Sequence, residues 1–188
     1  GLLRSIIVIN NDLYIYGGLR VYNQNYANLF KVNKINCKID STLNIKINSE
    51  VNSYKTISKI VFDNDYIYIS GKFTHVDGVK YDNITRINRN NYLIDSTFKF
   101  QMKGDLINGE IHDLEIINDN IYIAGSFTEI DNINIKFLAR INKHSGEIDT
   151  SWNYKINNIA YSISNYNSQL YISGKFSACN SLETNSLF

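Results

Sequence analysis

Short runs in which apolar and polar residues alternate recur along the chain, and this pattern predicts β-strands. Four runs share the order Leu or Ile, Tyr, Ile, a variable residue and Gly. Apolar stretches at residues 5–9, 57–62 and 111–117 precede the first three runs, and turns rich in Asn and Asp lie between, as in tight hairpins. No segment of useful length has the 3.6-residue period of a helix, so the sequence predicts an all-β fold. The runs end at Gly17, Gly71, Gly125 and Gly174, and a tyrosine stands three residues before each glycine: Tyr14, Tyr68, Tyr122 and Tyr171.

The four runs belong to a longer internal repeat. Their glycines lie 54, 54 and 49 residues apart, and a large apolar residue follows each glycine two residues later. The first three copies also share a cation, an Asn two residues after it and an Asp nine residues after it. Matches at so many fixed offsets indicate repeated structural units. The apolar residues are Leu19, Phe73, Phe127 and Phe176; the cations are Lys31, Arg86 and Arg140; the Asp residues are Asp40, Asp95 and Asp149.

Each unit of about 54 residues is expected to form four short antiparallel strands, which we name A to D. Strand A is the apolar stretch, strand B carries the Tyr-Ile run, and strand C carries the cation. Strand D is expected to end near Phe98 and Trp152. Four antiparallel strands in a repeated unit predict the blade of a β-propeller. The chain is then a partial propeller over residues 1–188, with blades at about 3–43, 56–98 and 110–152 and an incomplete fourth blade at about 159–188, or about three and a half blades.

The sequence resembles the delta-sixty repeat family. The resemblance is strongest in the third copy, with Ile121-Tyr122-Ile123-Ala124-Gly125-Ser126-Phe127, then Leu138-Ala139-Arg140-Ile141-Asn142, then Gly146-Glu147-Ile148-Asp149-Thr150-Ser151-Trp152. It implies propeller-like repeats of the kind found in bacterial surface and secreted proteins and in phage-encoded proteins, and it implies no catalytic residues. The first copy departs from the pattern, since Leu19-Arg20 replaces Phe-Thr and Lys31 replaces Arg.

By the repeat, Leu187 takes the place of Ile84 in strand C, so residue 188 falls inside the fourth unit. An incomplete blade leaves unpaired strand edges. We therefore expect further blades or other subunits to complete the ring.

The recurring cation and Asp are expected to be structural, because a catalytic residue occurs once in a ring whereas a structural residue occurs once in every blade. Each Asp should accept hydrogen bonds from the Ser or Thr that follows it and from the cation. The strand B tyrosines could form a sugar-binding aromatic ring, but packing between blades is the preferred interpretation. The sequence predicts no catalytic residue, no metal ligand and no cofactor. His75, His112 and His144 occupy non-equivalent positions, and Cys37 and Cys179 are expected to be free thiols.

The 19 basic and 18 acidic residues nearly balance, which disfavours nucleic-acid binding. The sequence has no run of 18 apolar residues, so it predicts no membrane-spanning helix. The B–C loops at 20–28, 74–82, 128–136 and 177–185 vary most between copies and are the expected binding surface for a protein or glycan partner. Asp77, Tyr81, Asp131 and Asn134 are the candidate binding residues there. We therefore expect a non-catalytic structural or binding module of a bacterial surface protein or virion, located outside the cell. The alternatives are a carbohydrate-active propeller enzyme whose site lies in other blades, and an intracellular scaffold.

Overall fold

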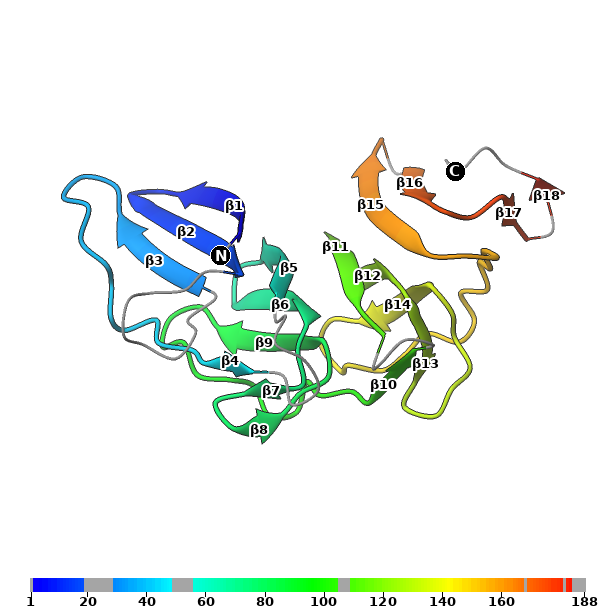
Figure 1. Ribbon diagram of the computed structural model, residues 1–188, viewed down its shortest axis with the longest axis horizontal. Helices are drawn as coiled ribbons and strands as arrows, with labels where there is room; N and C mark the ends of the chain where they lie inside the picture. Colours follow the sequence, from blue (N-terminus) through cyan, green and yellow to red (C-terminus); the bar gives the residue numbers. More distant parts are fainter. Residues whose placement is uncertain are drawn as a thin grey trace.

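The chain folds into antiparallel β-sheets arranged in sequence order along the long axis of the molecule (Figure 1). The computed structural model describes residues 2–18, 29–48, 56–104, 109–167, 169–180 and 182–183. Within these residues there is no helix, and all strand pairs are antiparallel. The all-β prediction is therefore confirmed. The loop at 20–28 and the residues Leu19 and Leu187 lie outside the described residues.

Three sheets of three strands repeat the same topology. Each contains strand A, strand B in the centre and strand C, in agreement with the hairpins expected from the sequence. We call these sheets units 1 to 3, and a two-stranded sheet with strands A and B is unit 4. The strands are β1 (Leu2–Ile9), β2 (Asp12–Gly18) and β3 (Leu29–Asn33) in unit 1; β5 (Thr56–Phe62), β6 (Tyr66–Lys72) and β9 (Ile84–Asn88) in unit 2; β11 (Ile111–Ile117), β12 (Asn120–Gly125) and β14 (Leu138–Asn142) in unit 3; and β15 (Ala160–Tyr166) and β16 (Gln169–Gly174) in unit 4.

The fourth strand of each unit is much shorter than predicted. In units 1 to 3 it is a single bridge to strand C, formed by Ile39, Ile94 and Ile148. The repeated Asp directly follows each of these isoleucines, and its side chain accepts hydrogen bonds from the residue two positions later, which turns the chain away from the sheet. Of the four short strands predicted for each unit, the described residues thus contain A, B and C as strands in units 1 to 3, and strand D as a single bridge.

The segment that leaves each unit pairs with the B–C loop of the next unit. We call residues 43–48, 98–104 and 152–156 the exit segments. The first two contain β4 (Ile47–Asn48) and β10 (Met102–Gly104), and the third forms one bridge between Ile156 and Cys179. Each unit is thus joined to the next by backbone hydrogen bonds. The loop strands are β7 (His75–Val76) and β8 (Val79–Lys80) in unit 2, β13 (Phe127–Ile130) in unit 3, and β17 (Ala178–Cys179) and β18 (Leu182–Glu183) in unit 4.

The hydrophobic core of the described residues consists of three clusters, and each lies between two successive units. The first joins Tyr14 of unit 1 to Ile60 of unit 2, the second joins Tyr68 to Leu114, and the third joins Tyr122 to Ile163. Strand A of each later unit accordingly packs on the unit before it. A single unit has too little apolar surface to bury on its own, so the units depend on stacking for stability.

The glycine that ends strand B permits a close approach to strand A. A Cβ atom at Gly71 would lie far inside the contact distance of the Thr56 carbonyl oxygen, and Gly125 and Gly174 meet the carbonyl oxygens of Glu110 and Ile159 in the same way. This contact explains why glycine recurs here. It is a steric requirement of the A–B hairpin, which only a residue without a side chain can meet.

Candidate functional site

The repeated cation and Asp form the predicted contacts in all three described copies. In unit 2, Arg86 Nε donates to Asp95 Oδ2 at 2.9 Å, and the backbone N–H and hydroxyl of Thr97 donate to Asp95 Oδ1 at 2.9 and 2.6 Å. Lys31 Nζ lies 2.8 Å from Asp40 Oδ2, and Arg140 Nε lies 2.8 Å from Asp149 Oδ2. The pair holds the turn that begins at the Asp, directly after the strand D bridge.

These hydrogen bonds favour the ionised carboxylate. Those from Lys31 and Thr42 lower the pKa of Asp40 to about 2, and those from Ser151 and Arg140 lower the pKa of Asp149 to about 2. Burial acts to raise the pKa of Asp95, but the contacts from Thr97 and Arg86 outweigh it, and the net pKa is lowered. The carboxylates are thus unprotonated anchors at neutral pH, which makes them poor proton donors.

In unit 2 the cation also reaches the following unit. Arg86 Nη1 and Nη2 donate to the carbonyl oxygens of Lys143 and His144, which lie in the turn between strand C and the position of strand D in unit 3. We call this the C–D turn; it spans residues 33–38, 88–93 and 142–147 in units 1 to 3. The rings of Tyr66 and Phe98 lie 4.4 and 4.6 Å from the Arg86 guanidinium carbon.

Three of the four strand B tyrosines are buried between units. Tyr14, Tyr68 and Tyr122 belong to the inter-unit clusters, whereas Tyr171 in unit 4 is 39% exposed. Their side chains pack against the next unit. The arrangement does not present a ring of aromatic faces to a sugar.

Of the four candidate binding residues in the B–C loops, two bind the preceding exit segment, one is buried, and Asn134 is exposed. Asp77 Oδ1 accepts the backbone N–H of Lys46 at 2.8 Å, and Asp131 Oδ1 accepts that of Gln101 at 2.7 Å, so both hold the exit segment of the preceding unit. Tyr81 is 2% exposed and belongs to the first core cluster. The prediction that Tyr81 lies on a binding surface is therefore wrong, since packing between units 1 and 2 buries it.

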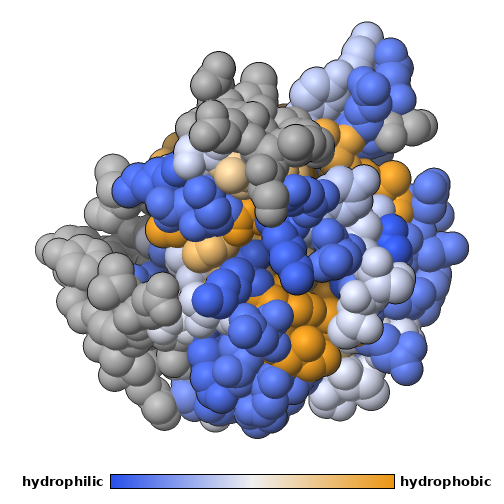
Figure 2. Space-filling model, turned by 90° about the vertical axis from the view of Figure 1, so that its right-hand side faces the viewer, coloured by the Kyte–Doolittle hydropathy of each residue, from blue (hydrophilic) through white to orange (hydrophobic). Residues whose placement is uncertain are grey.

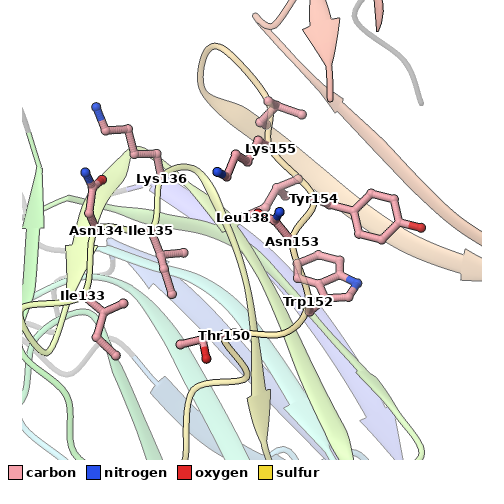
Figure 3. Close-up of a pocket in the computed structure, with 11 residues that line it drawn as sticks. Ile133, Asn134, Ile135, Lys136, Leu138, Thr150, Trp152, Asn153, Tyr154 and Lys155 are labelled. Atoms are coloured by element: carbon pink, nitrogen blue, oxygen red, sulfur yellow. The ribbon is translucent and has the colours of Figure 1, made fainter. Parts of the chain in front are cut away.

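Asn134 lines a pocket of about 420 Å³ beside the third exit segment (Figure 3). The B–C loop of unit 3 forms one side, and the chain from Thr150 to Lys155 forms the other. Trp152 and Leu138 supply apolar surface, and none of the lining residues is acidic. The lining comprises Ile133, Asn134, Ile135, Lys136, Leu138, Thr150, Trp152, Asn153, Tyr154, Lys155 and Ile156.

The pocket lies at the end of the molecule that holds units 3 and 4. Tyr154 is 45% exposed there, and its ring lies 5.3 Å from that of Trp152. Figure 2 views this end and shows hydrophobic surface between the hydrophilic side chains. The arrangement can bind a ligand by aromatic contact and by hydrogen bonds from amides and ammonium groups.

Sequence reasoning missed a polar network on the strand A faces. Asp113 on β11 accepts hydrogen bonds from Ser162 Oγ of unit 4 at 2.8 Å and lies 2.9 Å from Lys59 Nζ of unit 2. The three residues occupy equivalent positions, so one network connects three units. The three positions align in the repeat and could have been compared on that basis. They carry different residues, so they do not stand out among the recurring residues.

Comparison with known proteins agrees with the fold. Residues 118–151 match the family described as a domain of unknown function (DUF5122) beta-propeller. The match begins before β12 and ends within the turn that begins at Asp149, and it therefore contains strands B and C of unit 3. It supports a β-propeller repeat. No curated protein matches the chain.

No group of three or more His, Cys, Asp or Glu side chains among the described residues is placed to bind a metal ion. In the same part of the chain, no helix is long and apolar enough to span a membrane.

Proposed function

We propose that the chain is a non-catalytic β-propeller repeat module of the delta-sixty type, a structural or binding part of a bacterial surface or phage protein. The proposal rests on one observation: several of the repeated polar residues bind the neighbouring unit and thus have a structural role. Arg86 of the Arg86–Asp95 pair and the loop residues Asp77 and Asp131 hold one unit to the next. The recurring side chains thus stabilise the array of units. We assign partner binding to the side chains that vary between units.

The variable and exposed residues lie at the tips of the B–C loops. Val79 and Lys80 form the exposed strand β8 in unit 2, and Ile133 and Asn134 take these positions in unit 3. Tips that point the same way from a rigid array form a broad rim, which suits a protein or glycan partner. The module is then extracellular, and its partner is recognised by several units together.

A tip exchange tests this proposal. One variant carries Val79→Ile, Lys80→Asn, Ile133→Val and Asn134→Lys, which exchanges the tips of units 2 and 3 and conserves composition. The probe is a panel of purified polysaccharides: dextran, mannan, alginate and hyaluronan. We expect the natural chain to bind at least one of them and the exchange to change the affinity. The control is Tyr166→Ser, which alters an exposed residue of β15 away from the rim.

The same panel separates binding from catalysis. Release of reducing ends from a polysaccharide would overturn the non-catalytic assignment and favour a carbohydrate-active enzyme. Binding that the tip exchange leaves unchanged would show that the rim is not the recognition surface.

A further inference from the structure

The contacts between units 2 and 3 and between units 1 and 2 show what covers an exit segment. Arg86 donates to the C–D turn of unit 3, and a Cβ atom at Gly146 in that turn would lie 3.7 Å from the Phe98 ring and 3.9 Å from the Phe100 ring. The C–D turn of unit 3 therefore lies directly over the second exit segment. Between units 1 and 2, Tyr92 takes the position of Gly146 and packs on the cluster that contains Leu43 and Ile45.

The sizes of the facing residues compensate. The cluster that contains Leu43 and Ile45 packs against a large turn residue, Tyr92, whereas Phe98 and Phe100, the larger residues at the same repeat positions, lie against a glycine. Both turn residues have positive φ, 57° at Tyr92 and 75° at Gly146. A close-packed interior requires such compensation, because a void and an overlap both cost stability.

The third exit segment lacks this cover among the described residues. Trp152 and Tyr154 take the positions of Phe98 and Phe100, but Tyr154 is 45% exposed against 3% for Phe100. The side chain of Arg140 is 25% exposed against 5% for Arg86, which donates to two carbonyl oxygens of the next turn. The pocket occupies this uncovered place (Figure 3).

We infer that the pocket beside Trp152 is the receptor for the C–D turn of unit 4, the segment that follows strand C in the repeat. Two backbone carbonyl oxygens of the turn accept hydrogen bonds from Arg140, as those of Lys143 and His144 do from Arg86. Since Trp152 and Tyr154 form the largest of the three aromatic or aliphatic pairs, the turn residue with positive φ that faces them is small. The inference rests on the repeat module proposed above, but it concerns a contact between units and not the rim.

A graft tests the receptor directly, because Trp152 is the single tryptophan of the chain and reports on the pocket. The chain is extended after Phe188 by a copy of residues 86–98, which continues the repeat register. One graft carries Gly at the position of Tyr92, and the matched control keeps Tyr. The Gly graft should shift Trp152 emission to shorter wavelength, reduce its quenching by acrylamide and raise the urea midpoint, all more than the Tyr graft does.

Three results would overturn the inference. The first is a Gly graft that leaves quenching and the urea midpoint unchanged or lowers the midpoint. The second is a Tyr graft that shields Trp152 equally well. The third is shielding of Trp152 in the ungrafted chain that rises with protein concentration, which would assign the pocket to a second copy. None of these readings depends on polysaccharide binding, so they are independent of the test of the proposed function.

The size rule is tested separately within the existing chain. Gly146→Tyr should lower the urea midpoint, and so should Phe98→Leu with Phe100→Ile. The triple variant reproduces the combination found between units 1 and 2 and should recover much of the loss. The stability losses of the Gly146→Tyr variant and of the Phe98→Leu, Phe100→Ile variant can be added. If the triple variant loses as much as this sum, the turn and the exit segment do not compensate.

Discussion

Arg86 in unit 2 donates a hydrogen bond from its guanidinium group to the backbone carbonyl oxygen of Lys143 in unit 3. The same side chain is fixed within its own unit by Asp95. One residue therefore connects the turn that ends its unit to the turn of the next.

Arg86→Ala should destabilise the protein by about 3 to 5 kcal/mol, because it leaves the partly buried Asp95 carboxylate and two carbonyl oxygens without their donor. The matched variant is Arg140→Ala, at an equivalent pair that is far more exposed. Arg140→Ala should lower the free energy of unfolding by clearly less. Urea unfolding of both variants measures the difference, and equal losses would contradict the role of the following turn.

Gly71→Ala should cost about 3 kcal/mol, at the upper end of overpacking effects, because the new methyl group meets a backbone carbonyl that can move only with the hairpin. Gly78→Ala provides the comparison. Gly78 has φ +79° but open space around it, so its substitution should cost only about 1 kcal/mol of backbone strain. Thermal unfolding ranks the two variants, and the reverse order would rule out the steric explanation for the repeated glycine.

Stability should fall as the pH drops from about 4 towards 2. The pKa values of Asp40 and Asp149 are lowered to about 2, so their contribution is present above the ordinary pKa of an Asp carboxyl and is lost as the folded carboxylates take up protons. The double variant Asp40→Asn with Asp149→Asn should show a shallower fall over this interval. Urea midpoints measured at several pH values give both curves, and parallel curves would refute the assignment.

Asp82→Asn should stabilise the protein at pH 7. Burial raises the pKa of Asp82, and its Oδ1 atom is buried with no hydrogen-bond partner among the described residues. The ionised carboxylate is therefore unfavourable in the folded state above its ordinary pKa, whereas the neutral amide avoids this penalty. Near pH 3 the carboxyl is protonated in the folded and unfolded chains, and the gain should nearly vanish. A gain of the same size at both pH values would contradict the electrostatic cause.

The repeat and its local chemistry could be predicted from the sequence because they depend on short-range rules. Alternation predicts strands, Asn and Asp predict turns, and the fixed spacing of Arg86 and Asp95 places them on neighbouring segments of one sheet. The hydrogen bonds around Asp95 follow from residue types at a known separation. These features need no information on how one unit meets the next.

The contacts between units could not be predicted in the same way. Tyr81 and Asp131 stand in variable loops and look available to a partner, but the preceding unit buries the first and engages the second. Lys59 and Asp113 aligned in the repeat without resembling each other, and only the stacking of strands A brings them within 2.9 Å. The short fourth strand has the same origin, since the chain leaves its own sheet to pair with the next unit.

The compensation between exit segments and C–D turns makes the units non-interchangeable. If recombination between repeated gene segments removed unit 2, Leu43 and Ile45 would face Gly146 across an unfilled space. If it duplicated unit 2, Phe98 and Phe100 would collide with a second Tyr92. Genes built from repeats readily gain and lose copies, and a pairing of large with small residues at each junction selects against both events. The side chains at each contact between units therefore determine which unit can follow which.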